Sequence, residues 1–141
     1  MTSETKPHPR SGHRSAGLST VVGAAVADAL LIMVFAAIGR DAHQRGDIII
    51  GVLLTAWPFL AGAALGWLSF RVWRSPLAVL PSGLGVWIGA LAGGMILRAL
   101  TGQTVVFAFV VVALLSLGIL LVGYRLLLAG IRRMGRARGQ R

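Results

Sequence analysis

Apolar residues fill four long stretches of this chain, and short polar or basic segments separate them. The stretches cover residues 19–38, 48–70, 77–97 and 104–125. A helix needs about 20 mostly apolar residues to cross the hydrocarbon core of a bilayer, which is about 30 Å thick. The pattern therefore predicts an all-α integral membrane protein with four transmembrane helices, built as one domain over residues 19–129.

The two chain ends differ from this domain in composition. Residues 1–18 contain prolines, histidines and three basic residues but no apolar run, so a disordered basic N-terminal tail is predicted. Residues 130–141 are predicted to form a basic C-terminal tail. A basic segment before an apolar one also describes a secretory signal, but the first stretch is too long for one and is interrupted by Asp28, which favours a retained helix.

The composition excludes most water-soluble classes. The chain has 56% hydrophobic and 13% charged residues, a mean hydropathy of +0.80 and a net charge of +10. Its basic residues gather at the chain ends, which favours a bilayer with anionic headgroups as partner over nucleic acid. The absence of cysteine excludes disulfides and thiolate ligands. The excess of arginine over lysine is typical of GC-rich bacterial genomes.

The distribution of basic residues also predicts orientation. Eleven Lys and Arg residues lie on the side of the two termini and the 71–74 turn, and three lie on the other side. Cytoplasmic loops carry the excess of such residues. Both termini are therefore predicted to be cytoplasmic, in a multi-pass protein of the cell inner (plasma) membrane.

One carboxylate, Asp28, stands in the middle of the first stretch. A charge at that depth is costly and marks a candidate site. At about 1.5 Å per residue, Ser116 of the fourth stretch and the Trp87 indole fall near its level, and they are predicted as its hydrogen-bond donors. Arg125 is expected to snorkel to the interface, so no ion pair is expected. Asp28 is then either a proton or cation site or a protonated carboxyl that holds helices together.

Small residues recur at four-residue intervals in two stretches, at Gly62 and Gly66 and at Gly85, Gly89 and Gly93. A step of four returns to nearly the same helix face, so these rows predict flat faces for close helix packing. Pro58, near the centre of the second stretch, predicts a kink.

The connector at 40–47 holds the densest group of polar residues. Its His43 and two carboxylates could bind a divalent ion, but they lack a fixed ligand spacing, and Arg40 and Arg45 oppose a bound cation. A solvated turn is the preferred interpretation, and neither a metal nor another cofactor is predicted. Known catalytic motifs are absent from the sequence, so an enzyme is not expected.

Two short motifs carry a family resemblance. They are Ile38-Gly39-Arg40-x-x-His43, after a helix that bears Asp28, and Thr55-Ala56-Trp57-Pro58-Phe59-Leu60-x-Gly62. With them the chain resembles, over about Thr20 to Leu128, an uncharacterised membrane-protein family of actinobacteria and related prokaryotes, domain of unknown function 3054. The resemblance implies a small four-helix membrane protein. It singles out Asp28, Gly39, Arg40, His43, Trp57, Pro58 and Phe59, without a catalytic role for any of them.

Two functional hypotheses follow from these observations. In the first, an oligomer of this chain carries a proton, a cation or a small solute, with Asp28 as its ionisable centre. In the second, the chain is a non-catalytic interaction or assembly subunit of a larger membrane complex, and its glycine faces contact a partner. The candidate functional residues are Asp28, Arg40, His43, Trp57, Pro58 and Ser116.

Overall fold

The computed structural model describes residues 16–39 and 47–138, and every regular element in these ranges is helical. Four of the helices are long and apolar enough to cross a membrane. The predicted all-α fold with four membrane-spanning helices is thus confirmed. The first two spans are single helices, α1 (Leu18–Gly39) and α2 (Ile48–Ser69).

The third and fourth spans are each divided into several helical segments, and the third begins with a kink at Leu80, whose backbone is extended (φ −120°, ψ 135°). After the turn η1 (Val72–Arg74), the third span runs through η2 (Val79–Gly83), α3 (Leu84–Ile88), η3 (Gly89–Gly93) and α4 (Gly94–Leu100). The fourth span runs through α5 (Phe107–Leu117), η4 (Gly118–Val122) and α6 (Gly123–Arg138). The fourth span thus continues as a helix to Arg138, through most of the segment that the sequence pattern assigns to a basic tail.

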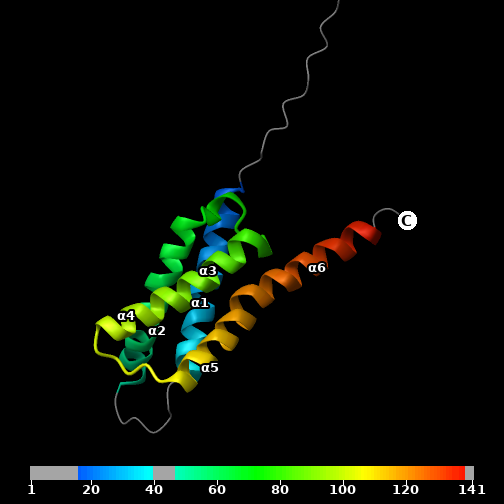
Figure 1. Ribbon diagram of the computed structural model, residues 1–141. Coiled ribbons are helices and arrows are strands. Elements are labelled where there is room, and N and C mark those ends of the chain that lie inside the picture. The colour runs from blue at the N-terminus through cyan, green and yellow to red at the C-terminus, as the bar shows by residue number, and fades with distance from the viewer. Residues whose placement is uncertain (1–15, 40–46, 139–141) are drawn as a thin grey trace, which may run out of the picture.

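The start of α1, the turn between α2 and the third span, and the end of α6 share one end of the bundle (Figure 1). The loop between α4 and α5 lies at the opposite end. The outer half of α6 projects beyond the other helices (Figure 1). The helices are shifted lengthwise relative to one another, and this shift decides which residues lie at the same level.

The two glycine rows pack against each other between α2 and the third span. A Cβ atom added to Gly89 would lie 2.7 Å from both the Gly62 carbonyl oxygen and the Gly66 Cα. A Cβ added to Gly66 would lie 2.5 Å from the Gly85 oxygen, and one added to Gly93 would lie 2.8 Å from the Gly62 Cα. Backbone thus meets backbone here, as the predicted packing faces require. In lipid, van der Waals packing of this kind is one of the forces that hold helices together.

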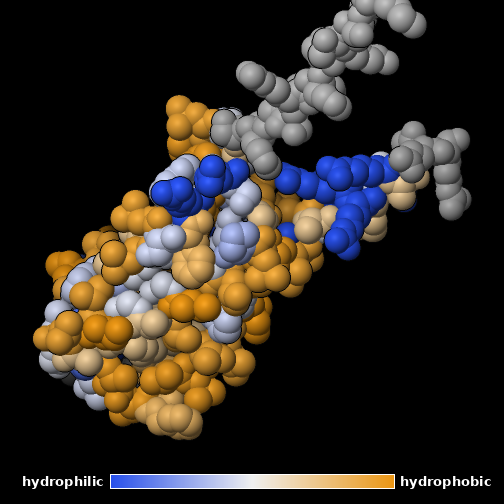
Figure 2. All heavy atoms as spheres, turned by 45° about the horizontal axis from the view of Figure 1, so that its top comes forward, coloured by the Kyte–Doolittle hydropathy of each residue, from blue (hydrophilic) through white to orange (hydrophobic). Residues whose placement is uncertain are grey.

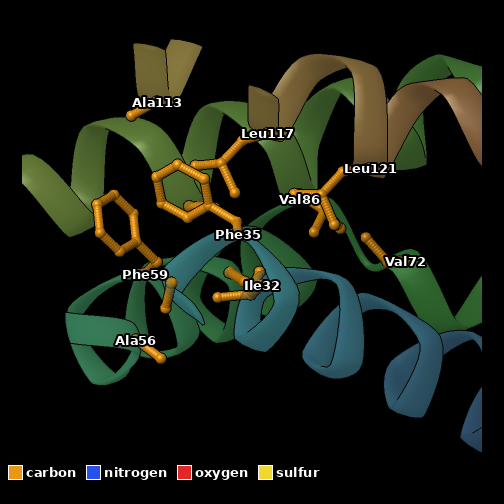
Figure 3. Close-up of a cluster of buried hydrophobic side chains, with 12 residues drawn as sticks. Ile32, Phe35, Ala56, Phe59, Val72, Val86, Ala113, Leu117 and Leu121 are labelled. Carbon is orange, nitrogen blue, oxygen red and sulfur yellow. The ribbon is translucent and has the colours of Figure 1, made fainter. Parts of the chain in front are cut away.

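Bulky side chains fill the bundle where the glycines end (Figure 3). Phe35 of α1 meets the Phe59 ring edge-on, with the ring centroids 5.2 Å apart, and Phe109 of α5 lies against both rings. Ile32, Leu117 and Leu121 complete this buried cluster. Pro58 is also buried, inside α2, which continues as one helix on both sides of it.

The outer surface is mostly apolar. In Figure 2, hydrophobic residues cover most of the visible face, and hydrophilic residues gather at the end from which α6 projects. Leu and Ile side chains such as Leu30, Leu54 and Ile119 are more than half exposed. A surface of this kind suits lipid chains and would aggregate in water.

Candidate functional site

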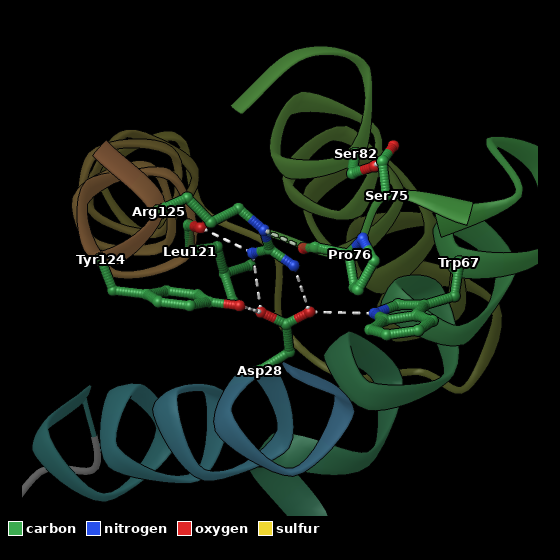
Figure 4. A network of polar contacts seen from close by, with 8 residues as sticks. All are labelled: Asp28, Trp67, Ser75, Pro76, Ser82, Leu121, Tyr124 and Arg125. Atoms are coloured by element: carbon green, nitrogen blue, oxygen red, sulfur yellow. Dashed lines mark hydrogen bonds and ion pairs between the residues drawn. The ribbon is translucent and has the colours of Figure 1, made fainter. Parts of the chain in front are cut away.

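The most unusual group in the bundle is a buried ion pair between Asp28 and Arg125 (Figure 4). The two side chains are 3% and 0% exposed. Arg125 Nη1 donates to Asp28 Oδ1 and Nη2 donates to Oδ2, each at 2.8 Å. The planar guanidinium thus holds both carboxylate oxygens, which is the strongest geometry for such a pair.

Two further side chains donate to the same carboxylate. The Trp67 indole nitrogen lies 2.9 Å from Oδ2, and the Tyr124 hydroxyl lies 3.0 Å from Oδ1. Asp28 therefore accepts four hydrogen bonds, two at each oxygen. A carboxylate with this many donors can keep its charge inside a bundle, because the donors replace the water that it loses.

The guanidinium uses four of its five N–H donors within the bundle. Its Nε donates to the Pro76 carbonyl at 3.0 Å, and Nη1 also donates to the Leu121 carbonyl at 2.8 Å. A Cβ atom on Gly83 would lie 2.9 Å from the Arg125 Cδ, so the glycine there leaves room for the arginine stem. The Asp28–Arg125 network, defined as Asp28, Trp67, Pro76, Tyr124 and Arg125, thus joins the first, second and fourth spans to the turn that precedes the third.

The predicted partners of Asp28 were wrong. Ser116 and Trp87 are not among its donors, and the Trp87 indole donates instead to the Leu114 carbonyl at 3.1 Å. Arg125 does not snorkel, because its side chain is fully buried. The depth estimate failed because it placed all helix ends at the same two levels. In the structure Asp28, ten residues into α1, is level with Trp67, two residues before the end of α2.

The other candidate residues that the structure describes lie apart from this network. Trp57 is 36% exposed on the surface of α2, and Pro58 is buried in the same helix. Ser116 is half-buried in α5. Arg40 and His43 lie outside the described residues. Among the residues that the structure describes, no group of three or more His, Cys, Asp or Glu side chains could hold a metal ion.

A cavity of about 400 Å³ opens between α1 and α2, and Asp28 is one of its lining residues. Its walls are almost wholly apolar and include Ile32, Leu60, Ala64 and the indoles of Trp67 and Trp73. Ala64 and Trp73 are exposed, so the cavity opens on the outside of the bundle. No pattern along the chain indicated this cavity, because the cavity depends on the crossing of two helices.

A bundle of four membrane-spanning helices with a charge pair buried among them defines a small multi-pass membrane protein. The family model described as "Protein of unknown function (DUF3054)" matches residues 25–128. The chain therefore belongs to this family, and the resemblance found in its motifs is confirmed. Searches of curated proteins and of solved structures found no match.

Proposed function

We propose that this chain is a plasma-membrane protein that binds a small amphiphilic solute in the cavity between α1 and α2 and, as a homo-oligomer, lets it cross the bilayer. The cavity carries this proposal, since it is an apolar space of small-molecule size that opens on the outside of the bundle, and Asp28 is one of the residues that line it. Both termini are proposed to be cytoplasmic, which rests on the distribution of basic residues.

The lining of the cavity indicates the class of solute. Its volume lies within the range of small-molecule sites. The apolar walls suit a hydrophobic body, and the indoles of Trp67 and Trp73 can hold a cationic head. The solute that fits these features is an organic amine held by the indoles through cation–π contacts, because both Asp28 oxygens already accept hydrogen bonds within the bundle. A bare inorganic cation is not favoured, because Arg125 already neutralises the carboxylate.

Oligomerisation needs a support other than the glycine rows. These rows were expected to suit association between chains, but within this chain they are covered by one another. The remaining argument for an oligomer is geometric. Side chains pack the centre of the four-helix bundle, so a passage has to form between copies or along the lipid-facing cavity.

Uptake of ethidium, an aromatic organic cation with amino groups, into proteoliposomes tests the proposal. Ala64→Phe should fill the cavity without changing any member of the Asp28–Arg125 network, and it should lower the uptake rate about tenfold or more, as expected when a pocket loses the space for a substrate group. Ala92→Phe, at an exposed position of the third span, is the matched control and should leave uptake unchanged. Uptake equal to that of protein-free liposomes, or equal in both variants, would refute the proposal.

A second candidate function is a non-catalytic assembly subunit, and the saturation of Asp28 by four hydrogen bonds favours it. A carboxylate so fully bonded within the bundle is suited to hold helices together. Purification in mild detergent separates the two candidates. A stoichiometric protein partner together with absent ethidium uptake supports the subunit, whereas a homo-oligomer with saturable uptake supports transport. Neither candidate includes a catalytic step.

A further inference from the structure

A second hollow lies at the end of the bundle where α1 begins and α6 leaves. It has a volume of about 460 Å³ and is lined by residues of three segments: Thr20, Ser75, Pro76, Leu77, Ala78 and Arg132. We call it the basic-end groove. It is more polar than the α1–α2 cavity, because an arginine and two hydroxyl side chains line it.

The basic-end groove lies at the depth of lipid headgroups if the Asp28–Arg125 pair lies inside the bilayer. Thr20 precedes Asp28 by eight residues, and Arg132 follows Arg125 by seven. At about 1.5 Å per residue, both lie about 10–12 Å beyond the pair, toward the same end of the bundle. The apolar face of α6 beyond the pair, which includes Leu127, Ile131 and Met134, is exposed.

The charges around the groove favour an anion. Arg74 in η1 and Arg133 and Arg136 in α6 are exposed at the same end. Among the described residues the acidic side chains are Asp28, which is paired inside the bundle, and Asp47, which precedes α2 at the opposite end. Among the described residues, no carboxylate is therefore available at this end of the bundle to compete with an anion for the groove.

We propose that the basic-end groove binds an anionic phospholipid through its phosphate group. The Arg132 guanidinium supplies a charged fork for phosphate oxygens. The hydroxyls of Thr20 and Ser75 line the same space, and Ser75 Oγ lies 3.2 Å from Ser82 Oγ, so it can accept from Ser82 and donate to phosphate. The exposed apolar face of α6 then lies beside the acyl chains. This proposal is independent of the solute proposal, because groove and cavity share no lining residue.

Lipid binding by the purified full-length protein in mild detergent tests this assignment. Phosphatidylglycerol and phosphatidylcholine are compared by native mass spectrometry and by their effect on the melting temperature. The wild type should retain phosphatidylglycerol preferentially. Arg132→Gln should weaken this binding about tenfold, more than the roughly fivefold per basic residue that general attraction to an anionic surface gives. Arg136→Gln is the matched control in the same helix, outside the groove, and should keep most of the preference.

A second variant and a competing anion complete the lipid-binding experiment. Thr20→Val removes one donor at nearly constant shape and should also weaken phosphatidylglycerol binding, so the test does not depend on one variant. Inorganic phosphate should neither displace the lipid nor raise the melting temperature as much. Equal losses in Arg132→Gln and Arg136→Gln would overturn the groove in favour of general surface attraction, and equal stabilisation by inorganic phosphate would make it a small-anion site.

Discussion

Two interfaces hold this bundle together, and they work by opposite means. Between α2 and the third span, glycines bring two backbones into contact without any side chain between them. Between α1 and α6, a carboxylate and a guanidinium meet, and every one of their hydrogen-bonding oxygens and nitrogens has a partner. Lipid supplies no hydrophobic force to press helices together, so shape and polar bonding have to do so.

The two interfaces differ in what they tolerate. The glycine interface depends on the absence of side chains and is disturbed by any side-chain atom that a substitution adds. The Asp28–Arg125 network depends on the presence of both charges and is disturbed by the removal of either one. Removing one partner of a buried pair leaves the other charge without compensation, whereas removing both is often nearly neutral.

The largest effect is expected from Arg125→Met. It leaves the Asp28 carboxylate buried with only Trp67 and Tyr124 as donors, and it should lower the free energy of unfolding by about 3–5 kcal/mol. Unfolding in mixed detergent micelles, followed by circular dichroism, measures this loss. Arg133→Met, which changes an exposed arginine of the same helix outside the basic-end groove, is the control and should stay close to the wild type.

The double variant Asp28→Leu with Arg125→Met sharpens the test. It removes both charges, so it should be more stable than Arg125→Met alone. A double variant that is less stable than either single one, or a single variant within about 1 kcal/mol of the wild type, would contradict a stabilising pair.

The fold could be predicted from the sequence because the membrane sets simple rules. A span has to be about 20 residues long, and four such stretches stand out in the chain. Gly62, Gly66 and Gly89 could be placed on packing faces because a four-residue step is a local property of a helix. These features need no knowledge of which helix lies beside which.

The partners of Asp28 could not be predicted, because they depend on how far each helix is shifted along its neighbour. Arg125 stands at the apparent end of its apolar stretch, although the helix continues to Arg138. The run of leucines and arginines that follows Arg125 in the sequence was the available indication that the helix does not end at this residue. The consequence is practical: Asp28→Asn leaves a buried guanidinium without its counter-charge, so loss of activity in that variant alone cannot separate function from folding.

A smaller effect is expected at the glycine interface. Gly89→Ala places a methyl group against the backbone of Gly62 and Gly66, and such overpacking should cost about 1–3 kcal/mol. Gly23→Ala in α1 is the matched control, since a Cβ there meets nothing within 4 Å. The control should be neutral or slightly stabilising, because alanine favours a helix over glycine by about 0.8–1.0 kcal/mol. Equal melting temperatures for the two variants would show that the backbones are not in contact.

The smallest effect is expected from Tyr124→Phe. It deletes one of the four hydrogen bonds to Asp28 and keeps the ring, whose centroid lies 4.7 Å from the Arg125 guanidinium carbon. Hydrogen bonds between membrane helices average about 0.6 kcal/mol in double-mutant cycles, so a loss of that order is predicted in the same unfolding assay. If the loss approached that of Arg125→Met, the hydroxyl would be as important as the charge pair. A small loss shows instead that the ion pair fixes α1 against α6, and that Tyr124 only completes the bonding of a carboxylate that Arg125 already holds.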